Sequence, residues 1–251
     1  MRARFVAMTM VVMALTGCGP GGDTDDRPVE PALSAGYAVP DNVGFTFRWT
    51  AESGIDLASR ESTVVRAYLE SYYIALGAHS SEKGYPGFTD ATAMQLGRWN
   101  YGGRSNQPLN QYTGTQFEHL LWLSPTASGW FATVCTGDYA VMRHGEDGKY
   151  YNVGSTAVGT EEIEIVAPPP PVAVSGALDS SGPERAPSRD VFAGWTIRHH
   201  QPATANIEAD RQCDTRMPDA REARPQQVNQ PHDVPYPSLA PIPGWPRSDQ
   251  E

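Results

Sequence analysis

Residues 59–77, SRESTVVRAYLESYYIALG, decide the fold because they carry the clearest helical pattern in the chain. Apolar residues recur there at i, i+3, i+4, i+7 and i+11, which places them on one face of an α-helix. Glu61 suits the first turn of that helix, and Gly77 suits its C-terminal cap. A helix with one apolar face must cover an apolar surface, so the rest of the chain has to supply one. The residues on that face are Val65, Tyr68, Leu69, Tyr72 and Leu76.

The segments around this helix carry strand patterns. At 45–49, aromatic residues alternate with polar ones, the period-2 pattern of a strand with one buried face. Residues 129–143 are rich in aromatic and β-branched residues, Asp147-Gly148 favours a hairpin, and residues 160–166 alternate again. We therefore expect an α+β fold in which the amphipathic helix packs on an antiparallel β-meander.

Four other segments have less regular patterns. Residues 91–99 and 117–123 are predicted as short helices, and the second of them, FEHLLWL, is apolar enough to belong to the core. The four-proline run at 168–171 cannot continue a sheet and predicts a stiff polyproline II connector. Beyond it, residues 191–199 are a further strand candidate, which we expect to pack back onto the sheet.

Composition divides the chain into successive parts. Prolines and polar residues without apolar periodicity predict disorder on both sides of the folded part, as an N-terminal tether and a Pro-rich C-terminal tail. The expected parts are a leader at 1–17, a tether at 18–43, the α+β core at 44–166, a Pro-rich connector at 167–190, a returning strand with a disulfide at 191–213, and a disordered tail at 214–251.

The first 18 residues have the features of an export signal. Arg2 and Arg4 precede the apolar run 5–15, which is too short to span a bilayer as a helix, since that needs ~20 residues. The run ends in LTGC at 15–18, which resembles the lipobox of bacterial lipoproteins. That resemblance implies that Cys18 carries diacylglycerol after removal of the leader and holds the protein on the extracytoplasmic face of the cell membrane. An ordinary cleaved signal with an incidental cysteine is the alternative.

Lipidation of Cys18 would leave two further cysteines. Cys135 and Cys213 then form an even pair in an exported, oxidising setting, which favours a disulfide between them. Two unpaired thiols are the alternative. Neither cysteine has a second cysteine or a histidine at ligand spacing, so no metal site is predicted.

The charge balance disfavours two classes of partner. The chain has a formal net charge of −10, and the predicted leader contributes two arginines and no acidic residue. An acidic protein lacks the clustered Lys and Arg that nucleic acids or anionic lipid headgroups attract. We expect no nucleic-acid partner and no polybasic contact with the membrane.

Element order also suggests a family. A tyrosine-rich amphipathic helix followed by a long antiparallel meander, over residues 44–166, is similar to the cystatin-like α+β fold of the nuclear-transport-factor-2-like superfamily. The resemblance implies a curved sheet that wraps the helix as a cone. In various members of that superfamily, the cone binds a small ligand, houses an active site or serves as a docking surface.

Four aromatic residues are candidates for the lining of such a pocket. Tyr68, Tyr72, Trp99 and Trp130 could contact a lipid, a sugar or a peptidoglycan fragment. The competing interpretation is that Tyr68 and Tyr72 are core residues, because they lie on the apolar face of the helix.

The histidine and serine motifs of common hydrolases are missing from the sequence. The six histidines show neither HxxxH nor HExxH spacing, and there is no GxSxG motif. We therefore predict no catalytic residue and no cofactor. The favoured function is a non-enzymatic envelope lipoprotein that binds an envelope protein or peptidoglycan. The alternative is a small-ligand carrier or a hydrolase with a cavity between helix and sheet.

Overall fold

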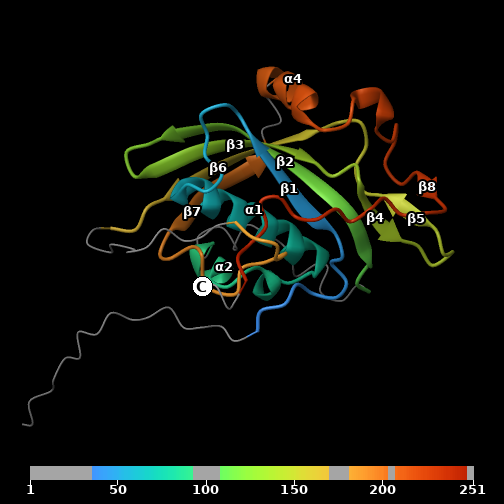
Figure 1. The fold of residues 1–251 in the computed structure, drawn as a ribbon, viewed down its shortest axis with the longest axis horizontal. Coiled ribbons are helices and arrows are strands. Elements are labelled where there is room, and N and C mark those ends of the chain that lie inside the picture. The colour runs from blue at the N-terminus through green and yellow to red at the C-terminus, as the bar shows by residue number, and fades with distance from the viewer. Residues whose placement is uncertain (1–35, 93–107, 170–180, 203–206, 248–251) are drawn as a thin grey trace, which may run out of the picture. The chain divides into compact units, whose positions relative to one another are not determined.

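The computed structural model describes residues 36–92, 108–169, 181–202 and 207–247. The long helix α1, Arg60–Gly77, begins where the sequence predicts, after an N-cap at Ser59 whose hydroxyl accepts a hydrogen bond from the Ser62 amide. Figure 1 shows α1 lying along one face of a sheet, with the helix α4 on the opposite face. An α+β fold is therefore confirmed.

Eight strands of the described ranges form one sheet in the order β7-β6-β3-β2-β4-β5-β8, with β1 also paired to β2. All their ladders are antiparallel except that between β1 and β2, which is parallel and so departs from a pure meander. The strands are β1 Thr46–Ala51, β2 Tyr112–Pro125, β3 Gly129–Gly137, β4 Val141–His144, β5 Tyr150–Asn152, β6 Gly159–Val166, β7 Thr196–Pro202 and β8 Pro231–His232.

The prediction of a helix at 117–123 is wrong, because these residues lie inside β2. Both faces of β2 are covered at this point, so a continuous apolar run is what the strand requires. Neighbouring residues of a strand face opposite sides of the sheet, so Leu120 and Leu121 enter different layers. Leu120 packs in the main core with α1, whereas Leu121 packs in a second cluster under α4.

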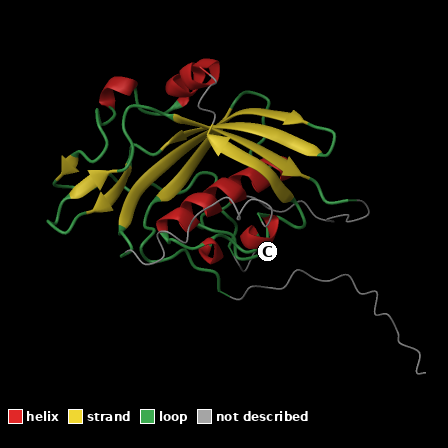
Figure 2. Cartoon of the chain, turned by 180° about the vertical axis from the view of Figure 1, so that it is seen from behind, coloured by secondary structure: helices red, strands yellow, loops and turns green. Residues whose placement is uncertain are grey.

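The helix α4, Ile207–Arg216, was not expected from the sequence. It lies on the sheet face opposite α1, as Figure 2 shows from behind, and it carries Cys213. The disulfide between Cys135 of β3 and Cys213 ties it to the sheet. The short helices η1 (Ser81–Lys83), α2 (Phe88–Ala91) and η3 (Arg221–Ala223) complete the described elements.

Disorder throughout 214–251 is wrong for the described part of this range. Residues 236–247, here called the C-terminal strap, run along the open edge of β1 and then onto α1. The Trp49 amide donates to the Ile242 carbonyl, and the Ile242 amide donates to the Phe47 carbonyl. Trp245, near the end of the strap, is 1% exposed. The strap therefore protects a strand edge that would otherwise be free to pair with another chain.

Other predicted boundaries also shift. The end of the tether, 36–43, packs on the core through Tyr37, Val39 and Val43. The described part of the connector includes Glu184, which pairs with Trp245. The predicted strand at 191–199 is observed as β7 at Thr196–Pro202, and it pairs with β6 as expected. The predicted helix at 91–99 lies outside the described residues apart from its first two positions.

Candidate functional site

The predicted aromatic pocket is brought together only in part. Tyr68 and Tyr72 lie between α1 and the sheet, where they are 1% and 9% exposed, and both pack edge-on against the His200 ring. Trp130 lies on β3, six residues before Thr136. It is therefore about 20 Å along the strand from the place where Glu118 pairs with Thr136. Trp99 is outside the described residues. The structure thus places the two tyrosines in the core.

A chain of hydrogen bonds joins α1 to β6 and β7. The Tyr68 hydroxyl lies 2.7 Å from Nδ1 of His200, whose Nε2 lies 3.0 Å from a carboxylate oxygen of Glu161. The other oxygen of Glu161 accepts a hydrogen bond from the Tyr73 hydroxyl at 3.2 Å. Both ring nitrogens of His200 are therefore engaged by protein groups. This network holds the helix on the sheet and leaves His200 without a free nitrogen for a substrate.

Glu118 lies on the same sheet face and is 1% exposed. Its two carboxyl oxygens accept hydrogen bonds from the Gln116 amide and the Thr136 hydroxyl, each at 2.7 Å. Burial raises the pKa of Glu118 well above its ordinary value, and the nearby charges of Glu161 and Asp138 raise it further. Glu118 is thus a buried carboxyl that keeps its proton to a higher pH than a solvent-exposed glutamate does.

A second buried carboxyl, Glu70, holds α1 to three distant segments. Trp49 and Trp245 donate their indole N–H groups to it at 2.8 Å, and the Tyr85 hydroxyl donates at 2.7 Å. Burial raises the pKa of Glu70, although the Arg66 guanidinium opposes the shift. With three donors on one carboxyl, Glu70 is a structural junction.

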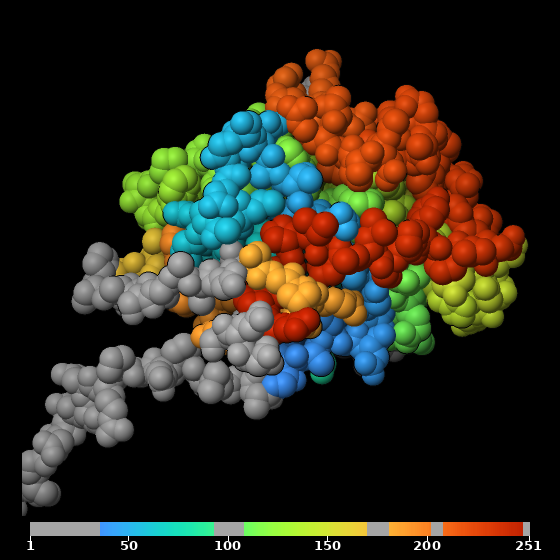
Figure 3. Space-filling model, in the orientation of Figure 1, coloured from blue at the N-terminus to red at the C-terminus, as the bar shows by residue number. Residues whose placement is uncertain are grey.

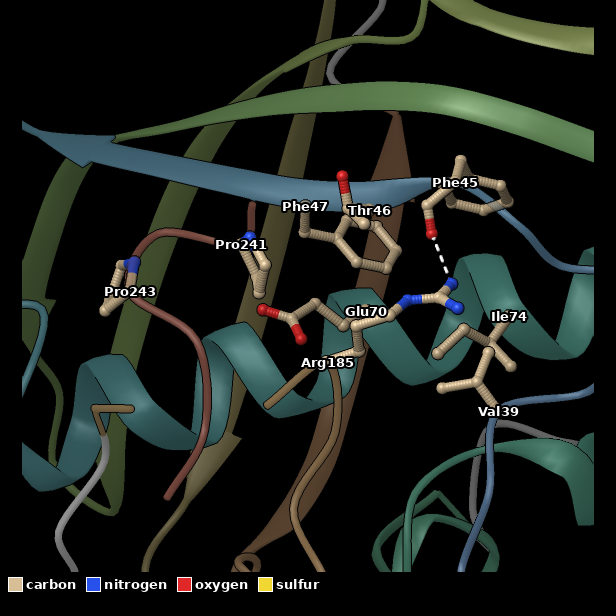
Figure 4. A pocket seen from close by; sticks show the side chains of 9 residues that line it. All are labelled: Val39, Phe45, Thr46, Phe47, Glu70, Ile74, Arg185, Pro241 and Pro243. Atoms are coloured by element: carbon tan, nitrogen blue, oxygen red, sulfur yellow. Dashed lines mark hydrogen bonds between the residues drawn. The ribbon is translucent and has the colours of Figure 1, made fainter. Parts of the chain in front are cut away.

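Figure 4 shows the small cavity beside this junction, between β1, α1 and the strap. Arg185 crosses it and donates to the carbonyl oxygens of Val43 and Phe45, at 2.8 and 2.7 Å. The cavity has room for about one water molecule. It cannot admit an organic ligand without a rearrangement of the strap.

The larger hollows lie on the outer face of the sheet, on the side of α4. In Figure 3 the strap, in red, and the segment around α4 and η3, in orange, form two ridges with strand atoms visible between them. We call the hollow between them the outer groove. Its apolar lining includes Phe117, Tyr139, Pro225, Tyr236, Pro237 and Leu239.

The walls of the outer groove are fixed by buried polar contacts. Arg224, which is 2% exposed, donates to the Asp214 carboxylate at 2.6 Å and to the Asp219 carbonyl at 2.7 Å. Its guanidinium also lies 5.2 Å from the centre of the Tyr139 ring. Together with the disulfide, these contacts give the groove a preformed shape.

Some of these residues could have been found from the sequence. Glu161 follows the same alternation as Ile163 and Ile165, so period 2 places it on the buried face of β6. The outer groove had no such signal, because its floor, at 115–140, and its walls, at 219–239, are far apart in the sequence. Cys18 lies outside the described residues, whereas Cys135 and Cys213 form the predicted bond.

Within the described ranges, His, Cys, Asp and Glu side chains do not gather into a group that could hold a metal ion. Among the helices that the structure describes, none has the length and apolarity needed to cross a bilayer. The chain matches no protein-family model, no curated protein and no solved structure at a level that would indicate kinship.

Proposed function

We propose that this chain is a cell-envelope lipoprotein, anchored through Cys18 to the extracytoplasmic face of a membrane, that binds an extended segment of another envelope protein in its outer groove. The observation that carries the proposal is the preformed, mainly apolar groove between the segment around η3 and the strap. Concave apolar sites with a few fixed polar groups are the usual form of binding sites.

Exposed apolar side chains support an interaction surface on this side of the molecule. Within the described residues, six large hydrophobic side chains are exposed, and four of them lie in the segment 228–242. Leu239 lines the outer groove and is 38% exposed. Apolar surface concentrated beside a groove favours a macromolecular partner. The exposed four are Val228, Val234, Leu239 and Ile242.

The partner's chemistry follows from the lining. Prolines from both walls and aromatic rings from the floor and the strap face the groove, and Asp219 supplies one charged group. Such a lining suits an extended peptide rich in proline or aliphatic residues, because aromatic grooves bind preordered extended chains at low entropic cost. A peptidoglycan strand is the competing occupant.

The experiment compares two surface variants in the lipidated full chain. Leu239→Arg places a long charged side chain in the groove, whereas Leu109→Arg makes the same change at an exposed leucine that does not line it. We expect one envelope protein to co-purify with the wild-type chain and with Leu109→Arg, and to be reduced at least about tenfold with Leu239→Arg. A photo-crosslinking residue at Tyr236 should form a covalent adduct with the same protein.

Three outcomes decide the proposal. Equal capture by both variants, or no adduct at position 236, contradicts groove binding. Binding of purified peptidoglycan that is lost only in Leu239→Arg identifies the cell wall as the occupant instead.

The second candidate function is a small-ligand site on the inner face of the sheet. The observation that favours it is the convergence of Glu118, Asp138 and Glu161, because burial raises the pKa of the first two. A positively charged ligand placed there would offset this cost. A titration of small cationic compounds that raises the melting temperature of the wild-type chain but not of Glu118→Gln would establish that function.

A further inference from the structure

Thr50, His119 and Glu52 meet at the outer face of the sheet, where β1 and β2 run parallel. Thr50 and His119 are direct register partners. Thr50 is an exposed residue, and its hydroxyl lies 2.8 Å from Nδ1 of His119. Glu52 comes two residues after Thr50 and is therefore on the same side of the chain. Its carboxylate lies 3.6 Å from Nε2 of His119.

His119 has an unused nitrogen although it is only 4% exposed. Nε2 is buried without a hydrogen-bond partner in the structure, since 3.6 Å to Glu52 is too long for a hydrogen bond. Burial lowers the pKa of His119, and Arg216 lowers it slightly, although Glu52 acts in the opposite direction. A neutral ring that accepts the Thr50 proton at Nδ1 carries its own proton on Nε2, which faces Glu52.

A cation and a pocket complete the arrangement. Arg216 of α4 donates its Nε–H to Glu52 and lowers the pKa of that carboxyl, so Glu52 is ionised at neutral pH. The pocket beside Thr50 is lined by Arg216 and by the apolar side chains of Phe117, Met217 and Ile242. A small apolar group bound there would lie next to the Thr50 hydroxyl.

We propose that Thr50 is a nucleophile for small carboxylic esters, with His119 as its base and Glu52 as the group that orients the imidazole. In the first step the Thr50 oxygen bonds to the ester carbonyl carbon, and the hydroxyl proton passes to Nδ1 of His119. The C–O bond to the alcohol then breaks, and His119 returns the proton to the leaving oxygen. Water hydrolyses the resulting threonyl ester by the same route and releases the acid.

The proposal is independent of partner binding in the outer groove and adds a chemical activity to it. Nucleophile, base and orienting carboxylate have the roles of a Ser-His-Asp triad, although the two imidazole nitrogens are exchanged. Arg216, which lines the same pocket, is the cation available to stabilise the oxyanion that forms on the carbonyl oxygen.

A fluorophosphonate probe tests the nucleophile directly in the purified full chain. The Thr50 oxygen displaces fluoride from phosphorus, and His119 takes the proton, which leaves a stable phosphonyl ester. Mass spectrometry of the peptide that contains positions 49–60 should place the adduct on Thr50, as distinct from Ser53 or Ser59. We also expect slow hydrolysis of p-nitrophenyl acetate.

Matched variants separate reactivity from folding. Thr50→Val keeps the side-chain shape and should abolish the adduct. His119→Gln keeps a hydrogen-bond acceptor but no base, so labelling should slow by at least about 100-fold. Thr215→Val removes an exposed hydroxyl that bonds only a backbone carbonyl of α4, and it should label like the wild type.

The labelling rate should also depend on the protonation state of the His119 imidazole. It should rise as His119 loses its proton and reach its plateau at a lower pH than it would with an exposed imidazole, because burial lowers the pKa of His119. An adduct on another residue, no adduct at all, or equal labelling of Thr50→Val overturns the proposal. Circular dichroism of each variant confirms that it is folded.

Discussion

Buried carboxyls are the residue-scale feature that most affects the behaviour of this protein with pH. A carboxyl whose pKa is raised on folding holds a proton that the unfolded chain releases above about pH 4.5. The folded state therefore binds more protons than the unfolded state, and the free energy of unfolding falls as pH rises. Glu118 belongs to this class because it is buried with only two neutral hydrogen-bond donors.

We predict that Glu118→Gln stabilises the protein at neutral pH. Glutamine keeps the contacts with Gln116 and Thr136 but cannot ionise, so the pH-dependent cost disappears. The gain should be close to zero at pH 4.5 and should grow with pH by up to about 1.4 kcal/mol per unit. Urea unfolding from pH 4.5 to pH 8 measures it.

Asp147→Asn provides a control of opposite sign. Its exposed carboxylate has a lowered pKa, because the Tyr151 hydroxyl and the Lys149 amide donate to it. Replacing Asp147 should therefore lower the free energy of unfolding above pH 4. This loss should become smaller as the pH falls below 4. Parallel curves for wild type and Glu118→Gln would contradict the prediction.

At the scale of single residues, the sequence predicts burial only at positions that local spacing governs. The stripe through Tyr68 and Tyr72 is correct because helical period alone fixes which face is buried. Trp245 could not be found in this way, because its partner Glu70 is 175 residues away. The triad-like contact of Thr50 and His119 depends on a parallel register that no local pattern specifies.

At the scale of elements, the C-terminal strap combines edge protection with a buried anchor. We predict that Trp245→Phe destabilises the protein by about 1–3 kcal/mol, because Glu70 loses one of its three donors inside the core. Trp122→Phe is the matched control, since Trp122 is 37% exposed and its change should stay within about 0.5 kcal/mol. Equal unfolding midpoints in urea for the two variants would show that the anchor contributes nothing.

The helix α4 depends on the disulfide for its attachment. It buries little apolar surface of its own: Ala209, Cys213 and the following Met217 meet Leu121 and Tyr139. Replacing both cysteines by alanine should cost up to about 4–5 kcal/mol, the chain-entropy value for a loop of this size. Amide exchange in 207–216 should accelerate more than exchange in α1. Unchanged protection of α4 would mean that its ion pairs suffice.

Element-scale errors in the sequence analysis have a common cause. The run at 117–123 resembles a buried helix because both of its faces are apolar, and only the layers formed by α1 and α4 explain why a strand needs that pattern. The strap was predicted as disordered from its prolines, yet proline is tolerated along a strand edge where few amide donors are needed. Composition describes a segment and does not identify the surface on which it packs.

On the scale of the whole molecule, the proposed lipid anchor and the folded domain are separated by a short stretch of chain. The first described residue is 36, so Cys18 lies at most about 65 Å of extended chain from the domain. Such an anchor would bring the protein close to partners in the same membrane or the adjoining cell wall, and the net charge of −10 of the full sequence disfavours direct contact with anionic headgroups.

The anchor itself is the last prediction. Cells given an alkynyl fatty acid should incorporate it into the wild-type chain and not into Cys18→Ala, because the other two cysteines are bonded to each other. The wild type should partition into the detergent phase, since two or more acyl chains bind a bilayer stably. The control is the double variant with Cys135→Ala and Cys213→Ala, which should incorporate the label as the wild type does. Label on Cys18→Ala, or no label on the wild type, would contradict the proposal that a lipid on Cys18 holds the protein at a membrane.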